Sequence, residues 1–204
     1  MTYIFLIIIL ILSVIIHEIA HGAAAFHLGD PTAKMMGRLS LNPIKHLDPV
    51  GSIIVPLFLI IIQSPILIGW AKPVPVNPAN FKDQKYGNAK VSLAGPGVNI
   101  GIAILFGLLL RFTGGFGNPG LQLMFSYIVL INLILAIFNL IPIPPLDGSH
   151  ILFTFLPDSM NSLKVTLQRY GFFILIFFIF FFLQFLFPLI TSIFRLIVGS
   201  PAPF

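Results

Sequence analysis

Four long apolar segments dominate this chain and restrict what it can fold into. They run over residues 3–26, 91–112, 121–141 and 172–198, and each is long enough for the roughly 20 helical residues that cross a bilayer. Charged residues make up only 8% of the 204 residues, against about 25% in soluble domains, so a water-facing surface cannot be built. We therefore predict an all-α multi-pass membrane protein that forms a single domain over residues 1–204.

A fifth apolar segment, residues 51–70, is divided by Pro56 and a Gln63-Ser64-Pro65 break into halves that are each too short to span. If the whole segment crossed the bilayer, the Lys and Arg residues would divide 5 against 6 between the two sides. If it turns back as a re-entrant hairpin, the division becomes 9 against 2, and the positive-inside rule places the larger group in the cytoplasm. We therefore predict about four transmembrane helices plus a re-entrant hairpin, in the plasma membrane, with the N-terminus outside.

The composition excludes several classes of function. The chain has no cysteine, which rules out disulfides, thiol catalysis and iron–sulfur clusters. Its net charge of +5 comes without any basic run longer than two residues. We therefore predict no nucleic-acid partner and attribute the positive excess to membrane topology.

The motif His17-Glu18-Ile19-Ala20-His21 is the strongest chemical signal in the sequence. Residues four apart lie on one face of a helix, so both imidazoles can bind a single metal ion. Glu18 is the only glutamate in the chain, and its place beside the two histidines suits a general base. Three such polar residues in a membrane helix would be costly without a metal, so we predict a metal site here.

Zinc in a catalytic site needs a third protein ligand, and Asp147 is the best candidate. It ends the stretch Asn139-Leu-Ile-Pro-Ile-Pro-Pro-Leu-Asp147, whose three prolines predict that the third span stops and opens into extended chain. The first and third spans cross in the same direction, so His17, His21 and Asp147 all fall near cytoplasmic ends. The alternative interpretation of Asp147 is that it is a solvated aspartate in a turn at the membrane interface. We interpret His27 as a histidine at the membrane interface, at the end of the first helix.

Three ordered motifs, HEIAH, AGPGVN at 94–99 and NLIPIPPLDG at 139–148, resemble the site-2 protease family of intramembrane zinc metalloproteases. The stretches 37–51 and 69–81 resemble compact bacterial and archaeal members without PDZ or CBS domains, for which this chain has no room. The resemblance covers roughly residues 5–155, the expected protease core 1–155. The C-terminal Phe-rich membrane segment, residues 165–198, matches nothing in the family pattern.

The resemblance implies one zinc ion per chain, with His17, His21 and Asp147 as ligands and Glu18 as catalytic base. Asn139 would contact the substrate or the developing oxyanion, and region 37–81 would present the substrate as an extended strand. The expected activity is hydrolysis of a peptide bond within or near a transmembrane segment of a membrane protein, as in regulated intramembrane proteolysis. The active site would lie toward the cytoplasmic side.

Two other functions are compatible with parts of the sequence. A membrane metal-handling or transport protein would use the same His/Asp site, and an inactive adaptor would keep the fold alone. The sequence leaves open the substrate, the oligomeric state, and whether 172–198 is one kinked helix or two pieces. It also leaves open the roles of four polar residues: His46, Asp48, Asn99 and His150.

Overall fold

The computed structural model describes residues 2–63, 70–200 and 202, and it contains helices but no β-strand in these ranges. Four of the described helices are long and apolar enough to cross a membrane: Ile4–His27, Gly87–Gly117, Pro119–Asn139 and Asn161–Phe182. The predicted all-α multi-pass membrane architecture is therefore confirmed.

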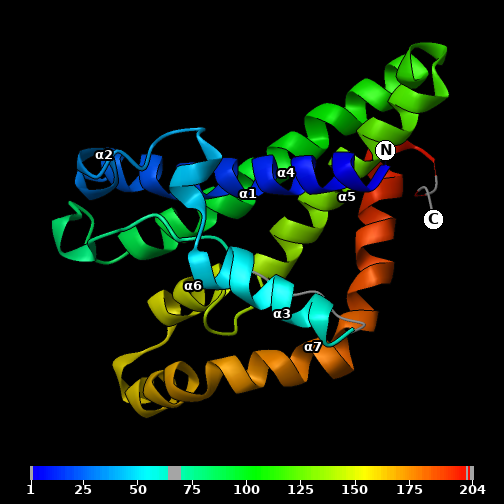
Figure 1. Cartoon of the computed structure of the whole chain (residues 1–204). Helices are drawn as coiled ribbons and strands as arrows, with labels where there is room; N and C mark the ends of the chain where they lie inside the picture. Colours follow the sequence, from blue (N-terminus) through cyan, green and yellow to red (C-terminus); the bar gives the residue numbers. More distant parts are fainter. Residues whose placement is uncertain (1, 64–69, 201, 203–204) are drawn as a thin grey trace.

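Helix α1 (Thr2–His27) lies along the bundle (Figure 1) and buries a stripe of every fourth residue from Ile9 on. The buried members of this stripe are Ile9, Ser13, His17, His21 and Ala25. A spacing of four keeps side chains on one side of a helix. The two histidines of the HEIAH motif therefore point into the protein, along the side of α1 that packs on α4 (Gly87–Thr113).

Helices α4 (Gly87–Thr113) and α5 (Pro119–Asn139) form an antiparallel pair joined by a tight turn. Helix α4 ends at Gly114, whose φ of 55° is a left-handed conformation that glycine adopts without strain. Asn118 then begins α5, because its side chain accepts hydrogen bonds from the N–H groups of Gly120 and Leu121. Helix α4 contacts both α1 and α5 and is the centre of the bundle.

Helix α7 (Asn161–Val198) is longer than the predicted fourth span and bends sharply along its length (Figure 1). The helix begins at Asn161, before the predicted membrane segment 165–198, because residues 161–164 contain no proline or glycine that would stop a helix. The bend has a cause in Pro188, which cannot donate to the Gln184 carbonyl and crowds it. The apolar piece Gln184–Val198 follows the candidate span Asn161–Phe182 within this one bent helix.

The largest apolar core lies between α4, α5 and the C-terminal part of α7. Its buried residues are Ala103, Leu110, Val129, Leu130, Leu133, Ile190, Phe194 and Val198. This core ties the end of the chain to the central helix pair.

The fifth apolar segment turns back on itself. It contains a π-helix, Pro49–Ile54, and the short helix α3, Val55–Ile61. The N–H of Trp70 donates to the Gly51 carbonyl at 3.2 Å, so both ends of the segment lie together, as in a hairpin. The predicted break at Ser64-Pro65 lies outside the described residues.

Helix α5 ends at Asn139, two residues before the predicted end of the third span at 141, and the residues after it are not extended. They form consecutive turns in which Ile143 N–H donates to the Ile141 carbonyl and Leu146 N–H to the Ile143 carbonyl. The expectation of extended chain was wrong because the prolines and these local hydrogen bonds fold the segment compactly. The turns lead directly into α6 (Asp147–Phe155), so Asp147 is its first residue.

The remaining helical elements are short. They are α2 (Thr32–Met35), two turns of 3-10 helix at Pro43–His46 and Pro78–Asn80, and two more at Gly114–Gly117 and Asp158–Met160.

Candidate metal centre

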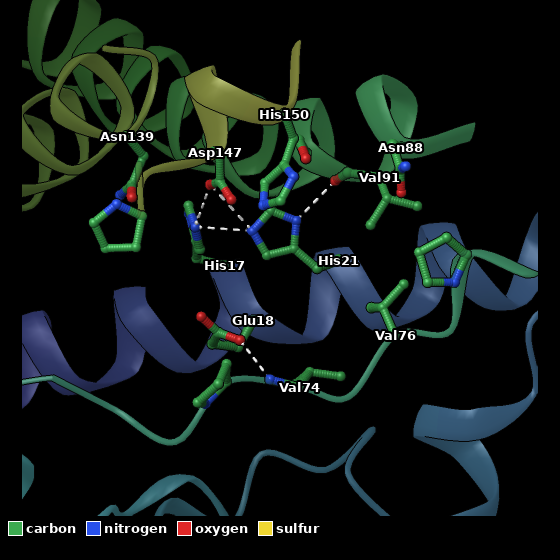
Figure 2. A pocket seen from close by; sticks show the side chains of 14 residues that line it. His17, Glu18, His21, Val74, Val76, Asn88, Val91, Asn139, Asp147 and His150 are labelled. Atoms are coloured by element: carbon green, nitrogen blue, oxygen red, sulfur yellow. Dashed lines mark hydrogen bonds and ion pairs between the residues drawn. The ribbon is translucent and has the colours of Figure 1, made fainter. Parts of the chain in front are cut away.

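The side chains of His17, His21 and Asp147 meet between α1 and α6 (Figure 2). The Nε2 atoms of the two histidines lie 3.1 Å apart. Asp147 Oδ2 lies 3.1 Å from His17 Nε2 and 3.2 Å from His21 Nε2. Three potential ligand atoms from two distant parts of the sequence thus form a nearly equilateral triangle.

The hydrogen bond that each histidine makes through Nδ1 determines whether its Nε2 atom carries a hydrogen or a lone pair toward the triangle. His21 Nδ1 lies 2.7 Å from the main-chain carbonyl of Val91, which can only accept, so Nδ1 must donate. His17 Nδ1 lies 2.6 Å from Asn99 Oδ1, which likewise only accepts. Each neutral imidazole therefore turns the lone pair of its Nε2 toward the centre of the triangle.

A chain of buried amides fixes this arrangement at His17. Asn132 Nδ2 donates to the Ile128 carbonyl at 2.9 Å and to Ser13 Oγ at 3.0 Å, which assigns its Oδ1 as the free acceptor. Asn99 Nδ2 donates to that oxygen at 2.7 Å, leaving Asn99 Oδ1 for His17. Asn99 and Asn132 have no exposed surface, so the chain is shielded from water.

The triangle fits a zinc ion. Two lone pairs and a carboxylate oxygen converge with no donor between them, an arrangement that a cation stabilises. Two ligands of a tetrahedral zinc with bonds of about 2.0–2.1 Å lie about 3.3–3.4 Å apart, close to the 3.1 and 3.2 Å between the atoms of the triangle. His17, His21 and Asp147 would hold the ion and leave a fourth position open.

Gly95 of α4 leaves room for such an ion. A Cβ atom at this position would lie 2.6 Å from His17 Nε2 and in direct overlap with His21 Nε2. Any side chain larger than hydrogen would therefore displace the potential ligands. The glycine of the AGPG sequence keeps the space beside both imidazoles clear.

A cavity of about 400 Å³ opens onto the triangle and is lined by the other two predicted site residues and by His150, whose role the sequence left open. Glu18, Asn139 and His150 all line it together with Asp147. Figure 2 shows Glu18 on the side of α1 toward residues 73–76, where its Oε2 accepts from the Val74 N–H at 2.8 Å. Asn139 donates through Nδ2 to the Leu135 carbonyl at 2.9 Å.

Three other polar residues lie outside the cavity lining. His27 is exposed at the end of α1. His46 is buried and bonds the Ser40 carbonyl at 2.8 Å through Nε2. Asp48 accepts from the N–H groups of Val50 and Gly51 and so caps the π-helix. The last two contacts stabilise the base of the hairpin.

Sequence reasoning did not identify Gly95, Asn132 or Val74 as parts of the site. Asn132 carried a signal, because an amide in the middle of an apolar span needs a buried partner. Gly95 lies inside a motif that the family resemblance included, but its role depends on the distance between two helices. The Val74 contact depends on how residues 70–81 return to α1, which no spacing in the sequence predicts.

Comparison with known proteins matches these observations. The model of peptidase family M50 matches residues 114–182, which include the turn segment and Asp147. A Bacillus subtilis protein named "Putative zinc metalloprotease YwhC" is 41% identical over 175 residues, 82% of this chain and 76% of that protein.

Two further relatives carry similar names. A Mycolicibacterium smegmatis protein named "Putative zinc metalloprotease Rip2" is 28% identical over 81% of this chain, which spans 62% of that relative. A Methanocaldococcus jannaschii protein, "Putative zinc metalloprotease MJ0611", is 42% identical over 32% of this chain and 33% of its own length. No solved structure matches the chain. The site-2 protease resemblance of the sequence is confirmed, and the chain belongs to peptidase family M50.

Proposed function

We propose that this protein is a zinc endopeptidase that hydrolyses a peptide bond within or near a transmembrane segment of a membrane protein. The observation that carries the proposal is the triangle of His17, His21 and Asp147, set in a bundle of apolar helices and open to the cavity that Glu18 lines. Such a site combines metal ligands, a carboxylate base and room for a peptide.

The residues of the cavity divide the chemistry between them. When bound, zinc supplies a Lewis acid that polarises a carbonyl and activates water. Glu18 takes a proton from the attacking water at its free carboxylate oxygen and delivers it to the leaving nitrogen. Asn139, at the end of α5, is the side-chain donor we assign to the developing oxyanion.

The substrate has to unwind before it can react. A helix engages its own carbonyls in hydrogen bonds, so a peptide bond in a transmembrane helix is exposed only where the helix is broken. We expect cleavage at sites with helix-breaking residues, and presentation of the opened peptide against the extended residues 73–77 rather than the folded turns after Asn139.

We also propose the orientation in the membrane. The outside N-terminus and the cytoplasmic active site follow from the 9 against 2 division of Lys and Arg residues, and we propose the plasma membrane as the location. A metal-transport function is less well supported. Its path would need free polar groups along the spans, whereas the amides of Asn99 and Asn132 and the Ser13 hydroxyl bond to one another.

The test pairs zinc content with cleavage in detergent for wild type, Glu18→Gln and Asp147→Ala. The substrate is a single-span protein with helix-breaking residues. We expect cleavage by wild type only, with zinc retained in Glu18→Gln and weakened in Asp147→Ala. Unchanged cleavage by Glu18→Gln would overturn the assigned base. Zinc binding without cleavage of any single-span substrate would favour metal handling.

A further inference from the structure

Residues 72–76, Lys-Pro-Val-Pro-Val, form a stiff segment with an unusual hydrogen-bonding capacity. Pro73 and Pro75 have no N–H, so Val74 carries the only main-chain donor of the three residues. A residue before proline is restricted to extended conformations, which applies to both Lys72 and Val74. We call the extended residues 72–77 the rod. Between its two prolines, Val74 therefore carries the single N–H.

Two buried charged side chains hold this rod at its ends. Arg38, only 7% exposed, donates to the carbonyls of Lys72 at 2.8 Å and Pro73 at 3.2 Å. Asp30, with no exposed surface, accepts from the Asn77 N–H at 2.7 Å and from the Asn80 side chain at 2.8 Å. Hydrogen bonds to charged groups are among the strongest in proteins, so the rod has little freedom to shift.

The middle of the rod is packed as well. Val74 is 7% exposed, and its side chain lies against Gly22 of α1, where a Cβ would come within 2.8 Å of the Val74 methyl. The N–H of Val74 donates to Glu18 Oε2 at 2.8 Å (Figure 2). Within the described part of the chain, this is the only hydrogen bond that the Glu18 side chain makes.

From this geometry we propose that the Val74 N–H is a positioning donor for the catalytic base: it holds Glu18 by Oε2 and leaves Oε1 to exchange the proton. The inference rests on the proposed function of Glu18. The hydrogen bonds of Arg38 and Asp30 indicate that the rod is a fixed support. Moving it away from Glu18 would break several buried hydrogen bonds.

Hydrogen exchange tests the contact without zinc or substrate. Pro73 and Pro75 have no amide hydrogen, so the Val74 amide exchanges as an isolated signal in this stretch. In metal-free protein in detergent, we expect it to exchange about tenfold or more faster in Glu18→Ala than in wild type. Glu18→Gln, which keeps a side-chain oxygen acceptor, should retain most of the protection. Equal exchange in wild type and Glu18→Ala would overturn the inference.

Kinetics of the zinc-loaded protein test the role. Val74→Pro removes the N–H in a segment that already tolerates proline, and Val74→Ala keeps the N–H while removing the same methyl groups. We expect kcat of Val74→Pro to be about tenfold or more below that of Val74→Ala, with the same KM and zinc content. An equal or higher kcat in Val74→Pro, or an effect on KM alone, would overturn the positioning role.

The two tests separate the inference from the proposed function. Absence of cleavage by wild type contradicts the peptidase function and leaves the exchange result to decide whether Glu18 is held. Active wild type with Val74 exchange independent of Glu18 contradicts only the positioning role.

Discussion

Gly95 offers the sharpest test of the metal centre, because a single methyl group decides whether the ligands can meet. In Gly95→Ala the new Cβ would lie 2.6 Å from His17 Nε2, whereas ordinary contacts begin at 3.4 Å. At least one imidazole must therefore move by about 0.8 Å, while zinc sites tolerate deviations of about 0.2 Å in their ligand distances. We expect zinc affinity to fall at least about 100-fold, about 2.7 kcal/mol.

The measurement is a zinc competition titration against a chromophoric chelator in detergent. Gly97→Ala is the matched control, because a Cβ at Gly97, on the same helix, meets nothing within 4 Å. Alanine should support the helix by about 0.5–1 kcal/mol at both positions, so loss of folding does not explain a difference. Wild-type zinc affinity in Gly95→Ala, with unchanged helical circular dichroism, would refute the assignment of the triangle as the zinc site.

The other predictions concern the supports of the site and the topology. Asn99→Leu leaves the His17 Nδ1–H without an acceptor, so zinc affinity in the same titration should fall about 10- to 100-fold; an unchanged affinity would contradict the tautomer assignment. Burial alone raises the pKa of Asp30, but hydrogen bonds from Thr32, Asn77 and Asn80 outweigh it and lower the pKa below 3.8. Because the pKa of Asp30 is lowered by folding, its ionised carboxylate stabilises the folded state above pH 3.8, and this contribution is lost as the pH falls through the folded-state pKa. The difference in free energy of unfolding between wild type and Asp30→Asn, measured with denaturant, should therefore shrink in acid. Reporter fusions after residues 80, 116, 160 and 204 should report inside, outside, inside and outside, and an outside signal at 80 would contradict the hairpin.

The apolar segments and the metal-ligand candidates could be predicted because each depends on local spacing. Spans follow from runs of about 20 apolar residues, and the i, i+4 spacing places His17 and His21 on one face. Asp147 could be nominated because prolines end the preceding span and the topology brings it to the same side of the membrane. These inferences need no knowledge of how the helices pack.

The boundaries and turns were predicted less well, for two physical reasons. Hydropathy predicts which residues can lie in the bilayer, but it does not predict where a helix begins. Helix α7 begins at Asn161 because the polar residues there are equally able to form a helix. Closely spaced prolines end a helix but do not distinguish extended chain from consecutive turns, so residues 140–146 were predicted as extended and are folded.

The supports of the site could not be predicted, because they depend on distances between elements. Gly95 matters through its approach to His17 and His21 across a helix interface. Arg38 and Asp30 act through main-chain groups of residues 72–77, and no sequence pattern identifies which carbonyl or N–H a side chain will reach.

The buried amide chain has a consequence for how the protein is made. His17 belongs to the first helix of the chain, its partner Asn99 to α4, and the supporting Asn132 to α5. Helices of a membrane protein enter the bilayer first and associate afterwards. A nascent chain that has inserted only α1 therefore carries the HEIAH motif but cannot bring its ligands together. His17, His21 and Asp147 come together only after α5 has packed and α6 has followed it. The ability to bind a metal ion at this site therefore depends on assembly of the helix bundle.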